Sequence, residues 1–468
     1  MGKVRLFGFY LPLLFLVLAV VEVLLITGTT VLSAIIRFDG NLAEVNHALG
    51  PLGFRAIPLG TILVLCLAAM GLYQINFREG YSGLVLRALI AFLLGWMVLA
   101  LLYYLIPELY IGRGVAALAF LISLLAIALF RPIYFKLINL EAMKPRVLIF
   151  GVGERAAWIS QHFKAKDIQN HFQLIGFVNT GGPRFVTGDV PILELDVPLC
   201  EYIRNKNVDQ IVVAVDDRRN GLPMQDLLNC RLAGVEIIEL ATFFERETGS
   251  VALELTDPSW MVFGQGFRRS VVIAGIKRLL DVLLSIVLVA VFWPVLLLTV
   301  IAIKIEDGLL APVLYSQTRV GEGGRQFKLF KLRSMRIDAE RESGACWARP
   351  DDDRITRVGR IIRKLRIDEL PQIINVIRGD MSFVGPRPER PEFTQNLELR
   401  IRYYRERCAV KPGVTGWAQL RCPYGASTKD SQEKLKYDLF YIKNHNTLFD
   451  LLIILQTVEV VIFGKGAR

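Results

Sequence analysis

The sequence has 468 residues, which is enough for two or three domains. Apolar residues make up 53% of it and the mean hydropathy is +0.42, more than a purely soluble globular protein needs. With part of the chain in a membrane, the net charge of +11 suits anionic lipid or phosphate-bearing substrates better than nucleic acid. The six cysteines show no C-x-x-C spacing and the four histidines no H-x-x-x-H spacing, so we expect no disulfide framework, zinc site or thiol chemistry.

Four apolar segments open the chain, at residues 7–36, 54–73, 83–106 and 113–130. Each is near or above the ~20 residues that a helix needs to cross a bilayer. The first is longer than the apolar part of a signal peptide, so it should remain as an anchor. We therefore predict a four-helix transmembrane bundle within residues 1–140. Glu22 is an unusual acid for such a helix, and a structural hydrogen bond inside the bundle is favoured over a functional site.

Charge asymmetry predicts the orientation of this bundle. Eight Lys or Arg residues lie on one side of the four-crossing arrangement and only three on the other. Because positive charge is enriched on the cytoplasmic side, both the N-terminus and everything after Phe130 should lie in the cytoplasm.

Residues 141–245 alternate apolar runs with amphipathic stretches, which is typical of a small Rossmann-like α/β domain. Its strands are expected at 147–150, 172–178, 210–215 and 235–240. After the first strand, residues 151–156 fit G-x-G-x-x-A, a turn whose N–H groups can hold a phosphate. The second strand ends in Asn179 and Thr180, without the acid that a dinucleotide-binding domain uses for ribose. We therefore expect that the turn at 151–156 serves packing or binds a regulatory ligand. Residues 246–272, after this domain, should form a β-rich connector.

Residues 282–303 carry no charge, and Pro294 lies near their middle. A fifth membrane-spanning helix, kinked at proline, is one interpretation. It would place residues 305–468 outside the cell, although both flanks of the segment are basic and favour the cytoplasmic face. We therefore predict a re-entrant helix over 277–305. The C-terminal apolar stretch at 448–463 is short and interrupted by acids, which favours an interfacial amphipathic helix.

Basic residues, glycine and proline are dense between residues 305 and 427, as in a site built for phosphates. A glycine-rich turn at 321–324, between alternating apolar and cationic residues, predicts a hairpin that presents Lys331 and Arg333. Arg387 lies between two prolines, and a rigid backbone there suits a phosphate clamp.

Asp368 and Glu369 form the most informative pair in the sequence. They end a run of basic residues with near-helical spacing and precede a proline in the first turn of a predicted helix over 370–377. The helix dipole and the neighbouring arginines should favour the anionic form of the aspartate. An ionised Asp can act as a nucleophile, as in enzymes that form aspartyl-phosphates. The adjacent Glu can hold Mg²⁺.

Together these residues resemble the bacterial sugar transferase family, the monotopic phosphoglycosyl transferases, over about residues 275–468. The resemblance is carried by Lys277-Arg278 with Asp281, Gln317-x-Arg319-x-Gly321, Lys331-x-Arg333-Ser334-Met335, Asp368-Glu369-Leu370-Pro371-Gln372, Gly385-Pro386-Arg387-Pro388 and Pro412-Gly413-x-Thr415-Gly416-Trp417. The upstream helices and α/β domain resemble the long form of the family, which initiates exopolysaccharide, capsule or O-antigen synthesis. Two departures, Trp293 in place of a serine before Pro294 and a longer loop at 308–312, concern local membrane geometry.

The resemblance implies transfer of a hexose-1-phosphate from a UDP-sugar to undecaprenyl phosphate, with Mg²⁺ as cofactor and UMP as product. Asp368 would form an aspartyl-phosphosugar intermediate, and Glu369 together with Asp368 would bind Mg²⁺. Residues expected to bind substrate are Lys277, Arg278, Asp281, Gln317, Arg319, Lys331, Arg333, Arg363, Arg366, Pro386, Arg387, Pro388 and Trp417.

The implied fold class is a membrane protein of α + α/β type. A mostly helical catalytic domain over 273–468 would lie on the cytoplasmic face of a bacterial inner membrane, with a re-entrant helix and interfacial amphipathic helices. The resemblance also implies a homodimer, and no nucleic-acid partner is expected.

Two other functions stay open. A glycosyl transferase could use Asp351 to Asp353 as a metal site and release UDP, although a solvated turn is the favoured reading of these acids. A membrane-bound nucleotide sensor or oxidoreductase could instead use the turn at 151–156. Trp417 could lie at the membrane interface or against a base.

Overall fold

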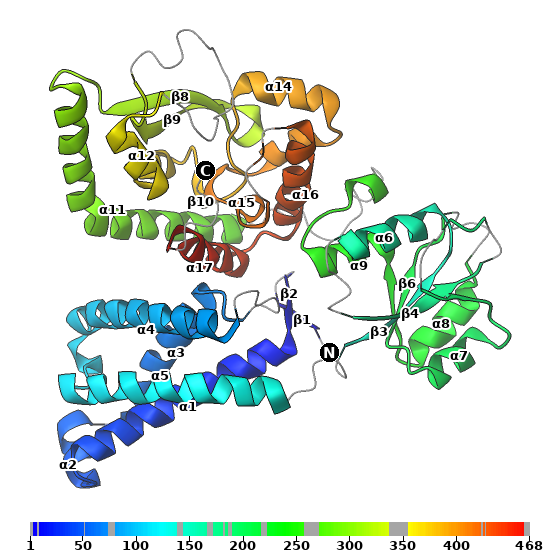
Figure 1. Ribbon diagram of the computed structural model, residues 1–468, viewed down its shortest axis with the longest axis horizontal. Coiled ribbons are helices and arrows are strands. Elements are labelled where there is room, and N and C mark those ends of the chain that lie inside the picture. The colour runs from blue at the N-terminus through cyan, green and yellow to red at the C-terminus, as the bar shows by residue number, and fades with distance from the viewer. Residues whose placement is uncertain are drawn as a thin grey trace. The chain divides into compact units, whose positions relative to one another are not determined.

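The computed structural model describes residues 3–6, 9–50, 52–73, 80–137, 144–165, 172–180, 183–185, 190–216, 222–256, 271–336, 354–422, 425 and 427–462 (Figure 1). The chain divides into two compact units, Met1–Lys3 with Phe135–Gln265 and Val4–Tyr134 with Gly266–Arg468. The first unit contains the α/β domain. The second contains the apolar N-terminal helices and the C-terminal domain.

Four long apolar helices dominate the N-terminal part of the second unit. They are α1 (Leu13–Arg37), α3 (Leu52–Ala69), α4 (Gly80–Leu105) and α5 (Arg113–Leu137). Each contains a stretch long and apolar enough to cross a membrane, as hydropathy predicted. Two short strands, β1 (Lys3–Leu6) and β2 (Phe9–Pro12), precede α1, so that helix begins later than expected. A short helix, α2 (Leu42–Leu49), and a 3₁₀ turn, η1 (Pro107–Leu109), were not predicted.

Glu22 in α1 is fully buried and paired with a cation. Its Oε1 and Oε2 accept hydrogen bonds from Arg131 Nε at 2.6 Å and Nη2 at 2.9 Å, and the Tyr73 hydroxyl also donates to Oε2. A bidentate guanidinium satisfies a carboxylate that would otherwise be very costly to bury. The favoured structural role of Glu22 is supported. Its partner was not foreseen because α5 extends past the predicted end of the fourth segment and carries Arg131 into the helix.

A five-stranded parallel sheet with the order β5-β4-β3-β6-β7 forms the centre of the α/β unit. The strands are β3 (Arg146–Phe150), β4 (Gln173–Val178), β5 (Ile192–Leu193), β6 (Gln210–Val213) and β7 (Glu236–Glu239). The helices are α6 (Glu154–Ala165), α7 (Leu199–Asn205), α8 (Met224–Leu232) and α9 (Leu240–Thr248). Val147 and Ile149 belong to one apolar core, and Leu148 and Phe150 to another, so both faces of the sheet are covered.

The four predicted strands are confirmed, whereas β5 has too few residues for a periodic signal. The prediction of a β-rich connector is wrong for the described part of residues 246–272. Residues 246–248 end α9 and residues 253–255 form a 3₁₀ helix, η3 (Leu253–Leu255), while Ala252 packs into the core of the sheet. This stretch therefore belongs to the α/β unit, and residues 257–270 lie outside the described residues.

The C-terminal domain is mostly helical, with two small sheets. The helices are α11 (Val271–Asp307), α12 (Arg357–Lys364), α13 (Gln372–Arg378), α14 (Pro391–Arg400), α15 (Trp417–Arg421), α16 (Thr428–Asn444) and α17 (Thr447–Ile462), with the 3₁₀ helices η4 (Glu322–Gly324), η5 (Ile367–Glu369) and η6 (Tyr404–Ala409). An antiparallel hairpin pairs β8 (Leu314–Val320) with β9 (Gln326–Leu332), and β10 (Ser382–Val384) pairs in parallel with β11 (Gly413–Thr415). The predicted hairpin and the helix that follows Pro371 are both confirmed.

Helix α11 bends into two limbs, and both of its ends are joined to the C-terminal domain (Figure 1). Near its start, Asp281 Oδ1 accepts a hydrogen bond from Ser382 Oγ at 3.0 Å. At its end, Asp307 Oδ2 pairs with Arg333 Nη2 at 2.7 Å. A straight helix of these 37 residues would be roughly 55 Å long. Joining both ends to one domain requires the bend, and Pro294 inside the helix removes a backbone donor and so permits it.

Candidate active site

Asp368 and Glu369 lie in η5, between α12 and α13. Arg366, just before them, has φ 58° and ψ 17°, a left-handed conformation that is uncommon for a residue with a side chain. The chain therefore turns sharply at the end of α12. Such a conformation persists only where the surrounding structure imposes it.

Asn375 fastens this carboxylate pair to the hairpin. It lies fully buried in α13, where its Nδ2 donates to the Lys328 carbonyl at 2.7 Å and its Oδ1 accepts from the Phe330 backbone N–H at 3.1 Å. Both hydrogen bonds go to β9, the strand that carries Lys331. The amide thus fixes the register between the short helix after Glu369 and the strand with the cation.

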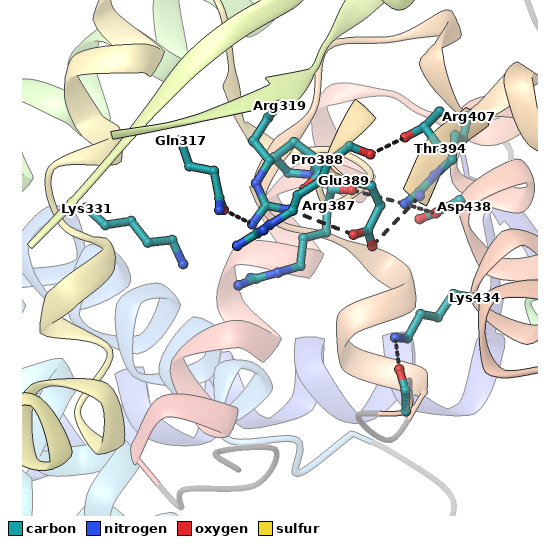
Figure 2. Close-up of polar contacts among 12 residues, drawn as sticks. Gln317, Arg319, Lys331, Arg387, Pro388, Glu389, Thr394, Arg407, Lys434 and Asp438 are labelled. Atoms are coloured by element: carbon teal, nitrogen blue, oxygen red, sulfur yellow. Dashed lines mark hydrogen bonds and ion pairs between the residues drawn. The ribbon is translucent and has the colours of Figure 1, made fainter. Parts of the chain in front are cut away.

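Three cations from different parts of the domain converge on one oxygen of Glu369. Oε1 lies 2.7 Å from Arg387 Nη2, 3.0 Å from Lys331 Nζ and 3.8 Å from Arg366 Nη1. In Figure 2 the Lys331 and Arg387 side chains point toward one another. Burial by itself raises the pKa of this carboxyl, but the three positive charges outweigh it and hold the pKa far below its usual range. Glu369 is therefore a fixed anion.

Asp368 is buried beside Glu369, but its carboxylate has different surroundings. Within the described part of the chain, no hydrogen bond or ion pair reaches its carboxylate. Burial raises its pKa, and the negative charge of Glu369 raises it further. Lys331, Arg363 and Arg387 lower it without outweighing these effects. The neighbouring arginines thus favour the anionic form of Asp368, as expected, but the pKa is raised overall because burial, which was not visible in the sequence, has the larger effect.

The two glycine-rich motifs of this region meet backbone to backbone. A Cβ on Gly385 would lie 2.3 Å from the Lys411 carbonyl oxygen, and one on Gly416 would lie 2.2 Å from the Gly385 carbonyl oxygen. Only glycine permits so close an approach. The contact continues in a hydrogen bond of 2.9 Å from the Gly413 N–H to the Pro386 carbonyl, so this turn sets the position of Arg387.

Other predicted site residues join elements of the domain together. Lys277 Nζ lies 2.6 Å from Asp450 Oδ2 in α17, and Arg278 donates to the Val376 and Ile377 carbonyls at the end of α13. Asp281 and Arg333 make the contacts described for the two ends of α11. Their contacts with substrate stay predictions.

Trp417 is only 2% exposed and lies in the core of the domain. Its ring stacks on Phe440 and meets Phe449 edge-on, and the Arg421 guanidinium lies over it at 4.3 Å. This placement differs from the expected position at the membrane interface or against a base. The sequence showed a tryptophan in a stiff loop but not the two phenylalanines from α16 and α17 that enclose it.

Within the described residues, no group of three or more His, Cys, Asp or Glu side chains could hold a metal ion, and Asp351 to Asp353 lie outside the described residues. Asp368 and Glu369 are a pair of carboxylates. Mg²⁺ is commonly bound by one or two carboxylates together with substrate phosphates and water. The contacts to Glu369 go to Oε1, so Oε2 and the Asp368 carboxylate are the oxygens that fit such an ion.

The glycine turn of the α/β unit is filled by the protein itself. The N–H groups of Glu154 and Arg155 donate to the Asp216 carboxylate at 2.8 and 2.9 Å, and a Cβ on Gly153 would lie 1.9 Å from Asp216 Oδ2. A carboxylate thus holds the helix N-terminus where a phosphate would bind in a dinucleotide site. This supports packing as the role of the turn. The signal missed in the sequence was the acid three residues after β6.

The family described as "Bacterial sugar transferase" matches residues 272–464, a segment that includes the carboxylate pair. A UDP-N-acetylgalactosamine-undecaprenyl-phosphate N-acetylgalactosaminephosphotransferase of Aeromonas hydrophila is 39% identical over 253 residues, which cover 54% of this chain and 58% of that protein. UDP-glucose:undecaprenyl-phosphate glucose-1-phosphate transferases are also similar. That of Xanthomonas campestris pv. campestris is 30% identical over 69% of this chain and 67% of its own, and that of Caulobacter vibrioides is 44% identical over 41% and 71%.

Replacing Arg363 by Gln should raise the pKa of Asp368 further, because a positive charge that favours the carboxylate is lost. A water-soluble carbodiimide reacts with protonated carboxyls, so its modification of Asp368, followed by peptide mass spectrometry, should persist to higher pH in Arg363→Gln than in wild type. Arg360→Gln, an exposed change on the same helix, is the control and should behave as wild type. An unchanged profile in Arg363→Gln would contradict the assigned electrostatics.

Proposed function

Since the chain belongs to the bacterial sugar transferase family, we propose that it transfers a sugar phosphate from a UDP-sugar to undecaprenyl phosphate and releases UMP. The names of the relatives from A. hydrophila, X. campestris and C. vibrioides support the acceptor and the sugar-phosphate group. Because the sugars in these names differ, the proposal is made for hexose-1-phosphates as a class. The first membrane step of exopolysaccharide, capsule or O-antigen synthesis is the place that we propose for this reaction.

The proposal rests on the different contacts and opposite pKa shifts of two adjacent carboxylates. Glu369 is held by three cations through its Oε1, whereas Asp368 is buried beside it without an ion pair among the described residues. A carboxylate with a raised pKa that is not pinned by a cation keeps its lone pairs available and is the more basic of the two. Neighbouring groups whose pKa values are pushed apart mark a division of roles. We assign Asp368 as the nucleophile.

The reaction proceeds in two displacements at one phosphorus. An oxygen of the Asp368 carboxylate attacks the β-phosphorus of the UDP-sugar, an O–P bond forms, and the bond from that phosphorus to the bridging oxygen breaks. UMP leaves with the bridging oxygen. An oxygen of undecaprenyl phosphate then attacks the same phosphorus, which produces the sugar-diphospholipid and returns the electron pair to Asp368 as a free carboxylate.

The cations around Glu369 are placed to receive the donor. Arg387, Lys331 and Arg363 lie beside the carboxylate pair, where phosphate oxygens of the donor would accept charge-assisted hydrogen bonds. These groups also neutralise the charge that builds up on the transferring phosphoryl group. Mg²⁺, held by Glu369 and Asp368, would further screen the donor phosphates when bound.

The outward-facing apolar surface of α11 supports re-entry into the membrane. In this helix the buried residues include Asp281, Ser285 and Thr299, while most leucines and valines face outward. That pattern is the reverse of a soluble helix and suits lipid. Because both ends of α11 join the same domain, we propose that it enters a bacterial inner membrane and returns to the cytoplasmic face. The four crossings of the N-terminal helices and the homodimer stay predictions.

Asp368→Asn should keep the fold but lower turnover by about 10³- to 10⁶-fold, because the nucleophile is lost. Turnover is measured as UMP released by the purified protein from a panel of UDP-sugars with undecaprenyl phosphate. Glu392→Gln, an exposed change in α14, should leave turnover unchanged. Release of UDP in place of UMP would instead favour a glycosyl transferase, and near-normal activity of Asp368→Asn would remove Asp368 from its role.

Re-entry predicts where the bend of α11 is accessible. In a cysteine-free background, Trp293→Cys should not react with a membrane-impermeant maleimide added outside intact cells. Ala43→Cys in α2, in the predicted periplasmic loop, should react under the same conditions. Labelling of the residue at position 293 from outside would show that α11 crosses the membrane.

A further inference from the structure

Two arginines from separate elements hold the backbone carbonyls of Arg387 and Pro388. Arg407 Nη2 in η6 donates to the Arg387 carbonyl at 3.0 Å, and Arg319 Nη1 in β8 donates to the Pro388 carbonyl at 3.2 Å. Figure 2 shows the two guanidinium groups reaching the turn from different parts of the domain. Two consecutive carbonyls are thus fixed by charge-assisted hydrogen bonds.

Arg407 is in turn fixed by buried partners. Asp438 Oδ2 in α16 lies 3.0 Å from Arg407 Nη2, and Arg407 Nη1 donates to the Tyr404 hydroxyl at 2.5 Å. Asp438 is 2% exposed, and burial raises its pKa to about 6, so the carboxylate is ionised at neutral pH. Glu389 lies 3.9 Å from both Arg407 and Arg319 and so bridges the two guanidinium groups.

This network fixes the backbone position from which the Arg387 side chain extends. Prolines on both sides of Arg387 restrict the backbone torsions, and the bound carbonyls remove the remaining freedom of the turn. The guanidinium of Arg407 is planar, so its N–H groups donate in fixed directions. The position of Arg407 therefore determines where the Arg387 carbonyl can accept the hydrogen bond. The Arg387 guanidinium then ends 2.7 Å from Glu369 Oε1. Among the described residues, no hydrogen bond or ion pair joins Asp438 to either carboxylate of the pair. The contacts that lead from Asp438 to them pass through Arg407 and Arg387.

We infer that Asp438 and Arg407 are positioning residues for Arg387 in the transfer reaction. The inference rests on the proposed function, in which Arg387 binds phosphate oxygens. A cation displaced by about 1 Å from its working position can cost on the order of 10²-fold in rate. A buried ion pair is weak evidence for stability, since burying two charges costs about as much as their attraction gains. We assign the Arg407–Asp438 pair the role of holding the turn at Arg387 in one position.

A double-variant cycle separates positioning from general stability. Asp438→Asn keeps the side-chain volume but removes the charge that holds Arg407, and it should lower kcat/KM by about 10- to 100-fold. If Asp438 acts through Arg387, adding Asp438→Asn to Arg387→Ala should cause little further loss. Glu433→Gln, on the same helix as Asp438, changes a carboxylate whose ion-pair partner is Lys436 and should leave kcat/KM unchanged.

Full additivity of Asp438→Asn and Arg387→Ala would overturn the inference. If Asp438→Asn does not fold, as judged by its melting temperature in detergent, Arg407→Lys replaces it in the cycle. Lysine keeps the charge that faces Asp438 but lacks the second planar donor for the Arg387 carbonyl. Wild type is measured first: a wild type that releases no UMP counts against the proposed function, whereas an active wild type with additive losses counts against positioning alone.

Discussion

The convergence of Arg387, Lys331 and Arg366 on Oε1 of Glu369 is the contact on which the rest of the active site depends. Each cation comes from a different element: the proline-flanked turn after β10, strand β9, and the left-handed residue at the end of α12. Like charges repel when they are brought so close, and the glutamate is what allows them to share a site. A donor with two phosphates would bring further negative charge to the same cations. These cations are therefore already arranged around one anionic group, Glu369, before any substrate binds.

Much of the domain serves to keep this centre in place. Asn375 ties the carboxylate pair to β9, the glycine contacts of β10 and β11 place the turn, and the ties from Asp281 and Asp307 hold the ends of α11. The outward surface of α11 is apolar, so the same contacts hold the carboxylate pair at a fixed place relative to the helix that we propose enters the membrane. A reaction that joins a water-soluble donor to a lipid acceptor needs such an arrangement.

Local patterns in the sequence predicted much of this fold. Hydropathy found the apolar helices, alternation found four strands and the hairpin, and the paired carboxylates with the proline-flanked arginine marked the site. Partners far apart in the chain left no local signal. Three such contacts join segments separated by 31 to 109 residues: Glu22 with Arg131, Arg407 with Asp438, and Asp216 with the N-terminus of α6. The raised pKa of Asp368 was not predicted either, because its main cause, burial of the side chain, leaves no local signal in the sequence.

The proposed covalent bond between Asp368 and phosphorus can be tested by incubating the protein with a UDP-sugar in the absence of undecaprenyl phosphate. We expect a burst of UMP of about one equivalent per protein. Intact-protein mass spectrometry should show the added mass of one phosphosugar, and peptide mapping should place it on residue 368. No added mass, together with UMP release that begins only when the lipid phosphate is supplied, would rule out the covalent intermediate and indicate direct transfer between the two substrates.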